Sequence, residues 1–187
     1  MGGSGSTRWE WHSKKDTVED CRSLDANLWM REGILREGIR TFGGWTWTDA
    51  YTGEKTSSIS YEVNTLNPAY RWVRLFYTFT RSNESLDYKV QLATTRPNFG
   101  GLRWWFICSL VKNGWACNRR VGKIHLPPSG KYYGCRHCYD LTYTSCQESD
   151  KRVSWLRRNP DALLAILNNC EDTDTSKLIL ALKAARL

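Results

Sequence analysis

The sequence predicts an α+β fold in which an antiparallel sheet runs directly into a compact unit built around cysteines and is followed by helices. Three observations support this prediction. Apolar and polar residues alternate in several short segments between residues 45 and 107, which is the period of a half-buried strand. Four cysteines follow, at positions 108, 117, 135 and 138. Beyond Asn159 the apolar residues recur at helical spacing.

The N-terminal part is expected to be a flexible leader over residues 1–22, followed by a short helix. Residues 2–7 consist of small and polar residues, mostly Gly and Ser. Ser23 is a suitable N-cap for a helix over residues 24–35.

Five strands are expected in the sheet, over residues 45–48, 57–63, 71–80, 86–94 and 102–107. Short polar turns separate them, so neighbouring strands are expected to pair as an antiparallel meander. In the strand 71–80 both alternating sets contain apolar residues, which indicates that both of its faces could be covered. The last strand leads straight into Cys108, so we expect the sheet and the cysteine unit to pack together.

The four cysteines are expected to meet at one end of a β-ribbon. A strand over residues 119–126 is expected to turn at 127–130 and return over 131–134, which brings the two cysteine pairs together. Cys135 and Cys138 form a Cys-x-x-Cys knuckle. Eight residues separate Cys108 from Cys117 where a standard knuckle has two to four, and the turn-forming pair Asn113-Gly114 is expected to loop out the excess. Asn118 is expected to adopt the left-handed conformation that glycine often supplies after such a cysteine.

Four thiolates suit one tetrahedral Zn²⁺ ion. Such a closed shell leaves no position for water or substrate, so the expected ion is structural and does not by itself make the protein an enzyme. The predicted fold is therefore an antiparallel β-meander continuous with a four-cysteine zinc ribbon, followed by C-terminal helices. The expected divisions are 1–22, 23–107, 108–146 and 147–187.

Other interpretations of the cysteines are weaker. The odd count of 7 and a polar N-terminus without a secretory signal argue against disulfides. His137 lies inside the second knuckle and could replace a cysteine, but ligands two residues apart fit a knuckle better than neighbours do. Cys21, Cys146 and Cys170 have no partner at metal spacing and are expected to be structural thiols.

Positive charge is concentrated around the predicted ribbon. Residues 103–158 contain 11 Lys and Arg and 3 acids, so this segment has a net charge of +8, the same as the whole chain. The other residues contain 16 basic and 16 acidic side chains and have no net charge. Aromatic residues are interleaved with these charges, which is typical of surfaces that bind nucleic acid. The expected phosphate contacts are Arg119, Arg120, Lys123, Lys131 and Arg136. The expected stacking side chains are Trp115, Tyr132 and Tyr133.

Three segments around the cysteines form a longer pattern. They are Gly100 to Cys108, Cys117 to Val121, and Leu126 to Tyr143 with its Pro-Pro-x-Gly-Lys-Tyr-Tyr-Gly-Cys-Arg-His-Cys core. This pattern resembles a family of uncharacterised bacterial zinc-ribbon proteins, and Arg8-Trp9 and residues 17–21 are also similar. The resemblance covers the chain to about Lys151 and implies a zinc ribbon without an assigned activity. Ser109 departs from it, because such proteins tend to have proline there.

The sequence thus favours a non-catalytic zinc protein that binds DNA or RNA. An adaptor that docks on an acidic protein, with the C-terminal helices forming a homodimer, is the alternative. A nuclease is less favoured, because the basic half offers only Asp140, Glu148 and Asp150 as possible Mg²⁺ ligands. A Cys21 and His12 nucleophile pair has no spacing to support it. No apolar run is long enough to span a membrane, and a bacterial-type cytoplasm is expected.

Overall fold

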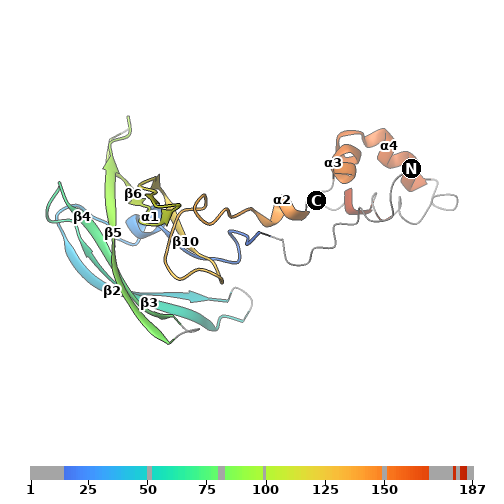
Figure 1. Ribbon diagram of the computed structural model, residues 1–187. Coiled ribbons are helices and arrows are strands. Elements are labelled where there is room, and N and C mark those ends of the chain that lie inside the picture. Colours follow the sequence, from blue (N-terminus) through green and yellow to red (C-terminus); the bar gives the residue numbers. More distant parts are fainter. Residues whose placement is uncertain are drawn as a thin grey trace. The chain divides into compact units, whose positions relative to one another are not determined.

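The computed structural model describes residues 15–49, 52–79, 83–98, 100–148, 151–168, 179 and 182–184 (Figure 1). The chain divides into two compact units, residues 1–142 and 143–187. The first unit contains the sheet together with all four clustered cysteines, and the second contains the C-terminal helices. The second unit begins four residues before the start at residue 147 that the sequence predicts for the helical segment.

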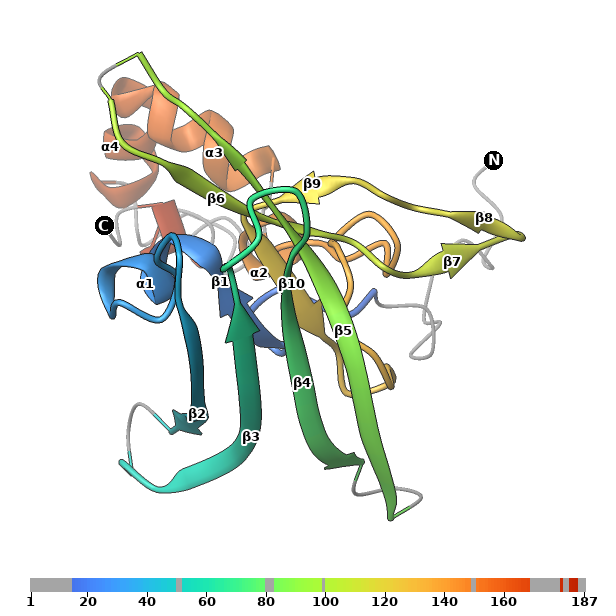
Figure 2. The same cartoon turned by 90° about the vertical axis from the view of Figure 1, so that its left-hand side faces the viewer.

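The first unit is built on a six-stranded antiparallel sheet that curls (Figures 1 and 2). Its strand order is β2-β3-β4-β5-β6-β9. The strands are β2 (Arg40–Thr48), β3 (Lys55–Asn64), β4 (Arg71–Phe79), β5 (Glu84–Thr95), β6 (Arg103–Ile107) and β9 (Arg120–Val121). This arrangement confirms the predicted meander, although β2 begins at Arg40 and is longer than expected.

The core fills the concave side of this sheet. Alternate residues point inward, as in the cross-strand rows Val63–Val73–Val90 and Leu92–Phe106, whose members are at most 4% exposed. Helix α1 (Ala26–Arg31) lies within the curve and places Trp29 against the sheet (Figure 1). Strand β10 (Lys123–Leu126) adds the fully buried Ile124, so residues between the two cysteine pairs share the core of the sheet.

Gly43 in β2 leaves room for the buried ring of Tyr61 on the neighbouring strand. A Cβ atom at Gly43 would lie 2.5 Å from the Tyr61 hydroxyl oxygen and 2.6 Å from the ring carbon that bears it. Gly44 is the next residue, and a Cβ there would make only an ordinary contact at 3.7 Å with the Ile59 carbonyl oxygen. A side chain at position 43 would therefore clash with Tyr61, whereas position 44 has room for a Cβ atom.

We predict that Gly43→Ala destabilises the protein by about 1–3 kcal/mol, because the Tyr61 ring must move within a packed core. Gly44→Ala is the matched control, and its free energy of unfolding is expected to stay within about 0.5 kcal/mol of the wild-type value. Urea denaturation measures both. Equal stabilities of the two variants would contradict the assigned packing of Tyr61.

The segment before α1 differs from the prediction. Residues 22–25 form a strand, β1 (Arg22–Asp25), which pairs antiparallel with β10. Asp25, and not Ser23, caps α1, since its side chain accepts a hydrogen bond from the Asn27 amide at 2.8 Å. The helix ends at Arg31 rather than at residue 35.

The predicted leader also extends too far along the chain. The amide of Val18 donates to the Thr142 carbonyl at 2.9 Å, and the amide of Thr142 donates to the Asp16 carbonyl at 3.1 Å. Residues 15–22 therefore belong to the folded unit. Residues 1–14, including Arg8-Trp9 and His12, lie outside the described part of the chain.

The second unit contains α2 (Thr144–Glu148), α3 (Lys151–Arg158) and α4 (Pro160–Asn168). The predicted start at Asn159-Pro160 is confirmed by α4, whereas α3 was not expected. Of the helix predicted from residue 174 or 175, only residues 179 and 182–184 are described, and they are helical. Among the described residues, no helix has the length and apolar character that crossing a membrane requires.

Candidate metal centre and the surface around it

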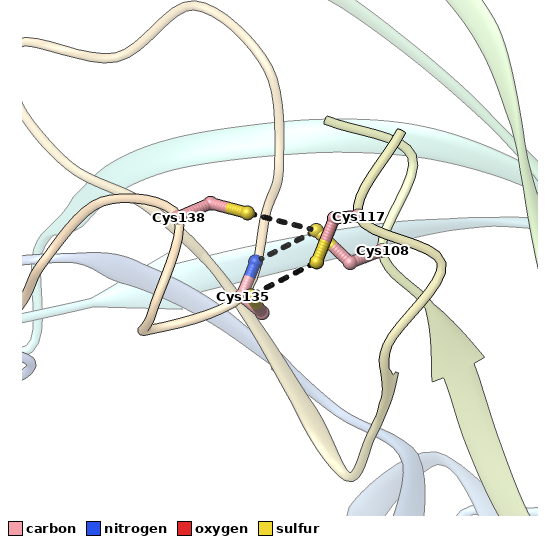
Figure 3. A group of neighbouring side chains, drawn as sticks. All are labelled: Cys108, Cys117, Cys135 and Cys138. Carbon is pink, nitrogen blue, oxygen red and sulfur yellow. Dashed lines mark hydrogen bonds between the residues drawn. The ribbon is translucent and has the colours of Figure 1, made fainter. Parts of the chain in front are cut away.

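The sulfur atoms of Cys108, Cys117, Cys135 and Cys138 all lie within 4.8 Å of one another (Figure 3). The distance between the sulfurs of Cys108 and Cys138 is 3.8 Å, and that between Cys117 and Cys135 is also 3.8 Å. A disulfide would require about 2.0 Å. Four sulfurs placed at about 2.3 Å from one ion in a tetrahedron stand about 3.8 Å apart. The spacing therefore fits a shared metal ion and excludes disulfides within this group.

The first knuckle is delivered by the end of β6. Cys108 follows Ile107, and its amide donates to the Arg119 carbonyl at 3.0 Å. The excess residues form a two-stranded hairpin, β7 (Val111–Lys112) and β8 (Trp115–Ala116). Its turn is Asn113-Gly114, with φ values of 53° and 80°, as the left-handed pair of a tight hairpin requires. Asn118 has φ of 48°, so both conformations expected from the sequence are confirmed.

The second knuckle folds as a tight turn over Cys135 to Cys138. The Cys138 amide donates to the Cys135 carbonyl at 3.1 Å, and the Cys135 amide donates to the Cys108 sulfur at 3.3 Å. Gly134 is needed just before it, because a Cβ there would overlap the side chain of Leu110 in the first knuckle. The two knuckles are thus packed so closely at Gly134 that a side chain at this position would not fit.

The β-ribbon between the knuckles is only partly formed. The turn is present, with the Gly130 amide donating to the Pro127 carbonyl at 2.9 Å. The outgoing strand is interrupted at Gly122, so that β9 joins the large sheet and β10 pairs with β1. The return over residues 131–134 contributes a single bridge between His125 and Gly134. The predicted regular hairpin is wrong in this respect, because the outgoing strand is divided between two sheets and the return does not form a strand.

The cysteines differ in their electrostatic surroundings. Burial raises the pKa of the Cys108 thiol, while hydrogen bonds from the amides of Leu110 and Cys135 act in the opposite direction. Burial, with the neighbouring cysteines, also raises the pKa of Cys138. At Cys117 burial acts to raise the pKa, but hydrogen bonds led by the Arg119 amide bring it below its ordinary value. A coordinated cation offsets the cost of burying thiolates, because its positive charge balances theirs, and it therefore favours loss of their protons.

The other candidate ligands and nucleophiles that the structure describes are not members of this group. His137 is exposed and is not a member of it. The Cys21 thiol donates to the Thr17 carbonyl at 3.1 Å, and burial together with Asp16, Asp20 and Glu19 raises its pKa to about 11, so it is a poor nucleophile. Asp140 is exposed and forms an ion pair with Lys15 at 2.7 Å. The side chain of Glu148 and the whole of Asp150 and Cys170 lie outside the described residues.

The predicted nucleic-acid residues are placed in different settings. Arg119 and Arg120 are exposed, and Trp115 is 81% exposed at the tip of the hairpin. Lys123 pairs with Asp25 at 3.1 Å, and Lys131 pairs with Glu84 at 2.6 Å. Two of the five predicted cations are therefore balanced by acids within the protein.

The remaining three predicted residues differ in how far they are exposed. Arg136 is half-buried and has a partner within the protein. Tyr132 is 38% exposed. Tyr133 is 1% exposed, with its ring packed against Trp47 and Tyr77, so the prediction that it stacks on a base is wrong.

Sequence reasoning missed Lys112. This residue pairs directly with Trp115 across the hairpin, and both are exposed. The Asn113-Gly114 turn between them is the signal that could have found it, because residues flanking such a two-residue turn are cross-strand neighbours.

Comparison of the chain with protein-family models, with curated proteins and with solved structures gives no match. Membership of a zinc-ribbon family and a cytoplasmic location accordingly stay predictions from the sequence.

Proposed function

We propose that this chain is a non-catalytic zinc protein that binds nucleic acid through the hairpin of its first knuckle and the arginines that follow it. The proposal takes zinc as the metal because the donor set consists of four sulfurs. Soft thiolates at tetrahedral spacing favour Zn²⁺ over Mg²⁺ or Ca²⁺, which prefer oxygen. With all four sulfurs engaged, the ion would hold the two knuckles together and take no part in chemistry.

The observation that carries the nucleic-acid assignment is the position of Trp115. This residue is 81% exposed at the tip of a hairpin whose base is tied to the cysteines. The ring is held away from the core on this hairpin, where a flat ligand can reach it. Nucleobases are suitable partners, because every base presents a π-face to an aromatic ring.

Three cations lie on this hairpin and on the segment that follows it. Lys112 lies opposite Trp115 in the hairpin, and Arg119 and Arg120 follow Cys117. Among the described residues, none of these three side chains forms an ion pair with an acid. Their charge is thus available for phosphate groups. Lys123 and Lys131 would contribute less, because they would first have to leave Asp25 and Glu84.

We predict that Arg119→Glu/Arg120→Glu weakens binding to a labelled oligonucleotide by at least about 10-fold at low salt. It should also make the slope of log affinity against log salt less negative by about two, because each arginine that no longer neutralises a phosphate accounts for about one unit. Fluorescence anisotropy at a series of salt concentrations measures both quantities. Zinc content should not change, since neither arginine is a ligand.

The matched control is Arg31→Glu/Arg36→Glu, which makes the same change in net charge at exposed positions in α1 and in the loop that follows it. If both double variants weaken binding equally, the effect comes from total charge and the proposed surface is wrong. If neither does, the protein does not bind nucleic acid through phosphate contacts.

A role for the second unit in protein contacts is compatible with this function. Its described residues expose four large apolar side chains, namely Trp155, Leu164, Leu182 and Ile179, each at least 49% exposed. These would fit a homodimer or an adaptor contact. A protein partner that is still recovered after nuclease treatment would support the adaptor role.

A further inference from the structure

The outer face of the curled sheet carries aromatic rings where polar side chains would be usual. An antiparallel sheet with one face on the core normally alternates apolar inward and polar outward. Here Trp72 and Phe76 on β4 and Trp105 on β6 alternate with buried residues, and Phe42 on β2 alternates with half-buried ones, so all four point outward. Phe42 is 65% exposed, and the other three rings are half-buried. The elements that pack on the sheet, α1 and β10, lie on its opposite side (Figures 1 and 2).

A cation lies over each of these four rings. Arg40 is 5.4 Å from the centre of Phe42, Arg74 is 4.7 Å from Phe76, Lys89 is 4.3 Å from Trp72 and Arg103 is 4.3 Å from Trp105. Such cation–π contacts hold the long side chains beside the rings. The outer face is thus an ordered array of rings and positive charges.

The cations of this array differ in whether an acid holds them in an ion pair. On β2 to β4, Glu62 is 3% exposed and lies 2.7 Å from Arg40, and Arg74 forms a close pair with Asp87 at 2.5 Å. On β5, β6 and β9, the cations are Lys89, Arg103 and Arg120. Among the described residues, none of these three is held in an ion pair by an acid.

Space for a ligand exists beside Phe76. A shallow hollow of about 610 Å³ is lined there by Phe76, Asp87 and the hydroxyl-bearing residues Ser58, Ser60, Thr78 and Ser85. Apart from Phe76 these residues are small or polar, and they point outward on β3, β4 and β5. The ring of Phe76 therefore has open space next to it on the same face.

We infer that the outer face of this sheet is a platform for single-stranded nucleic acid, an inference that rests on the proposed function and specifies its ligand. Exposed rings on a sheet stack unpaired bases, and nearby cations contact the phosphates. Bases within a duplex are stacked on each other and cannot use such rings. Arg120 projects from β9 on this face, and together with Arg119 it joins the platform to the hairpin of the first knuckle. The phosphates of such a strand would complement the charges of Lys89, Arg103 and Arg120, which no acid among the described residues holds in an ion pair.

The first test compares Phe42→Ala with Tyr70→Ala. Both residues are more than half exposed, at 65% and 54%, but Tyr70 lies in the loop between β3 and β4, outside the array. With a 12-nucleotide oligo-dT strand as the probe, Phe42→Ala should weaken binding at least about 5-fold, the lower limit for losing one stacked base, and Tyr70→Ala should not. A 12-base-pair duplex should bind more weakly than the strand and should be insensitive to Phe42→Ala.

The second test does not depend on a variant. Ultraviolet cross-linking of wild-type protein to a strand that contains 5-bromodeoxyuridine, followed by mass spectrometry, should label residues in the ranges 40–48, 71–79 and 103–107. Cross-links confined to residues 109–118, with unchanged affinity of Phe42→Ala, would overturn the platform and leave the proposed function intact. If neither strand nor duplex binds, the proposed function itself is wrong.

Discussion

Replacing Cys135 with serine is expected to abolish stoichiometric metal binding and to lower the free energy of unfolding by at least about 5 kcal/mol. Structural zinc contributes about 10–16 kcal/mol of apparent binding free energy in small domains, which exceeds the net stability of most proteins. A serine hydroxyl does not replace the thiolate in this donor set. The effect extends beyond the knuckles, because Tyr133 and Ile124 on either side of the ribbon turn belong to the core of the sheet.

Metal analysis measures the zinc content of the Cys135→Ser protein, and thermal melting measures its stability. Cys146→Ser is the control, since Cys146 is exposed in α2 and is not part of the four-cysteine group. That variant should keep one zinc ion per chain and melt as the wild type does. A Cys135→Ser protein that retains one ion and an unchanged melting temperature would show that the four sulfurs do not share a metal.

Replacing Trp29 with alanine is expected to cost about 3–5 kcal/mol of stability while leaving zinc bound in the folded protein. Trp29 is fully buried, and its ring lies 4.9 Å from Tyr61, 5.9 Å from Trp45 and 5.9 Å from Phe106, measured between ring centres. Its removal leaves a large cavity between α1 and the sheet, and it also removes the favourable packing of these aromatic rings on one another.

Denaturation in urea at fixed zinc concentration measures the change in stability. Met30→Ala is the matched control, because Met30 is the next residue of the same helix and is 40% exposed. Its stability should change by about 1 kcal/mol or less. If the two variants are equally stable, α1 does not close the core of the sheet as described.

Comparing these two variants also distinguishes the contribution of the four-cysteine group to stability from that of the apolar core. The Cys135 change acts on the candidate metal centre, and the Trp29 change acts on the apolar core. Cys108 connects the two, because it follows β6 directly, and Phe106 of that strand packs against Trp29. We therefore expect removal of the metal to loosen β6, whereas the Trp29 change lowers stability without altering the spacing of the sulfurs.

The local features of the candidate site could be predicted from the sequence. The four cysteines, the Asn113-Gly114 turn and the left-handed Asn118 were all identified, because each depends on residues close to it in the chain. Strands β3 to β6 and the start of α4 were found for the same reason, from the local period of apolar residues and from a capping pattern. Zinc and nucleic-acid binding stay proposals built on that pattern.

Pairings between distant segments could not be predicted. Strand β1 looks like a helix start in isolation and becomes a strand only because it pairs with β10, about a hundred residues later. The segment at Thr17 likewise folds against Thr142. The prediction that both Tyr132 and Tyr133 stack on bases is wrong for Tyr133, because Tyr132 is partly exposed and Tyr133 is buried.

The sequence by itself determined the candidate metal ligands, the main strands and the excess of positive charge, since residue type and short-range spacing carry that information. Only the tertiary structure decided which face of the sheet is outward, which cations are balanced by acids and which rings are exposed. The physical reason is that exposure and charge balance depend on neighbours from other strands. Alternation separates two faces but does not say which one packs on the core.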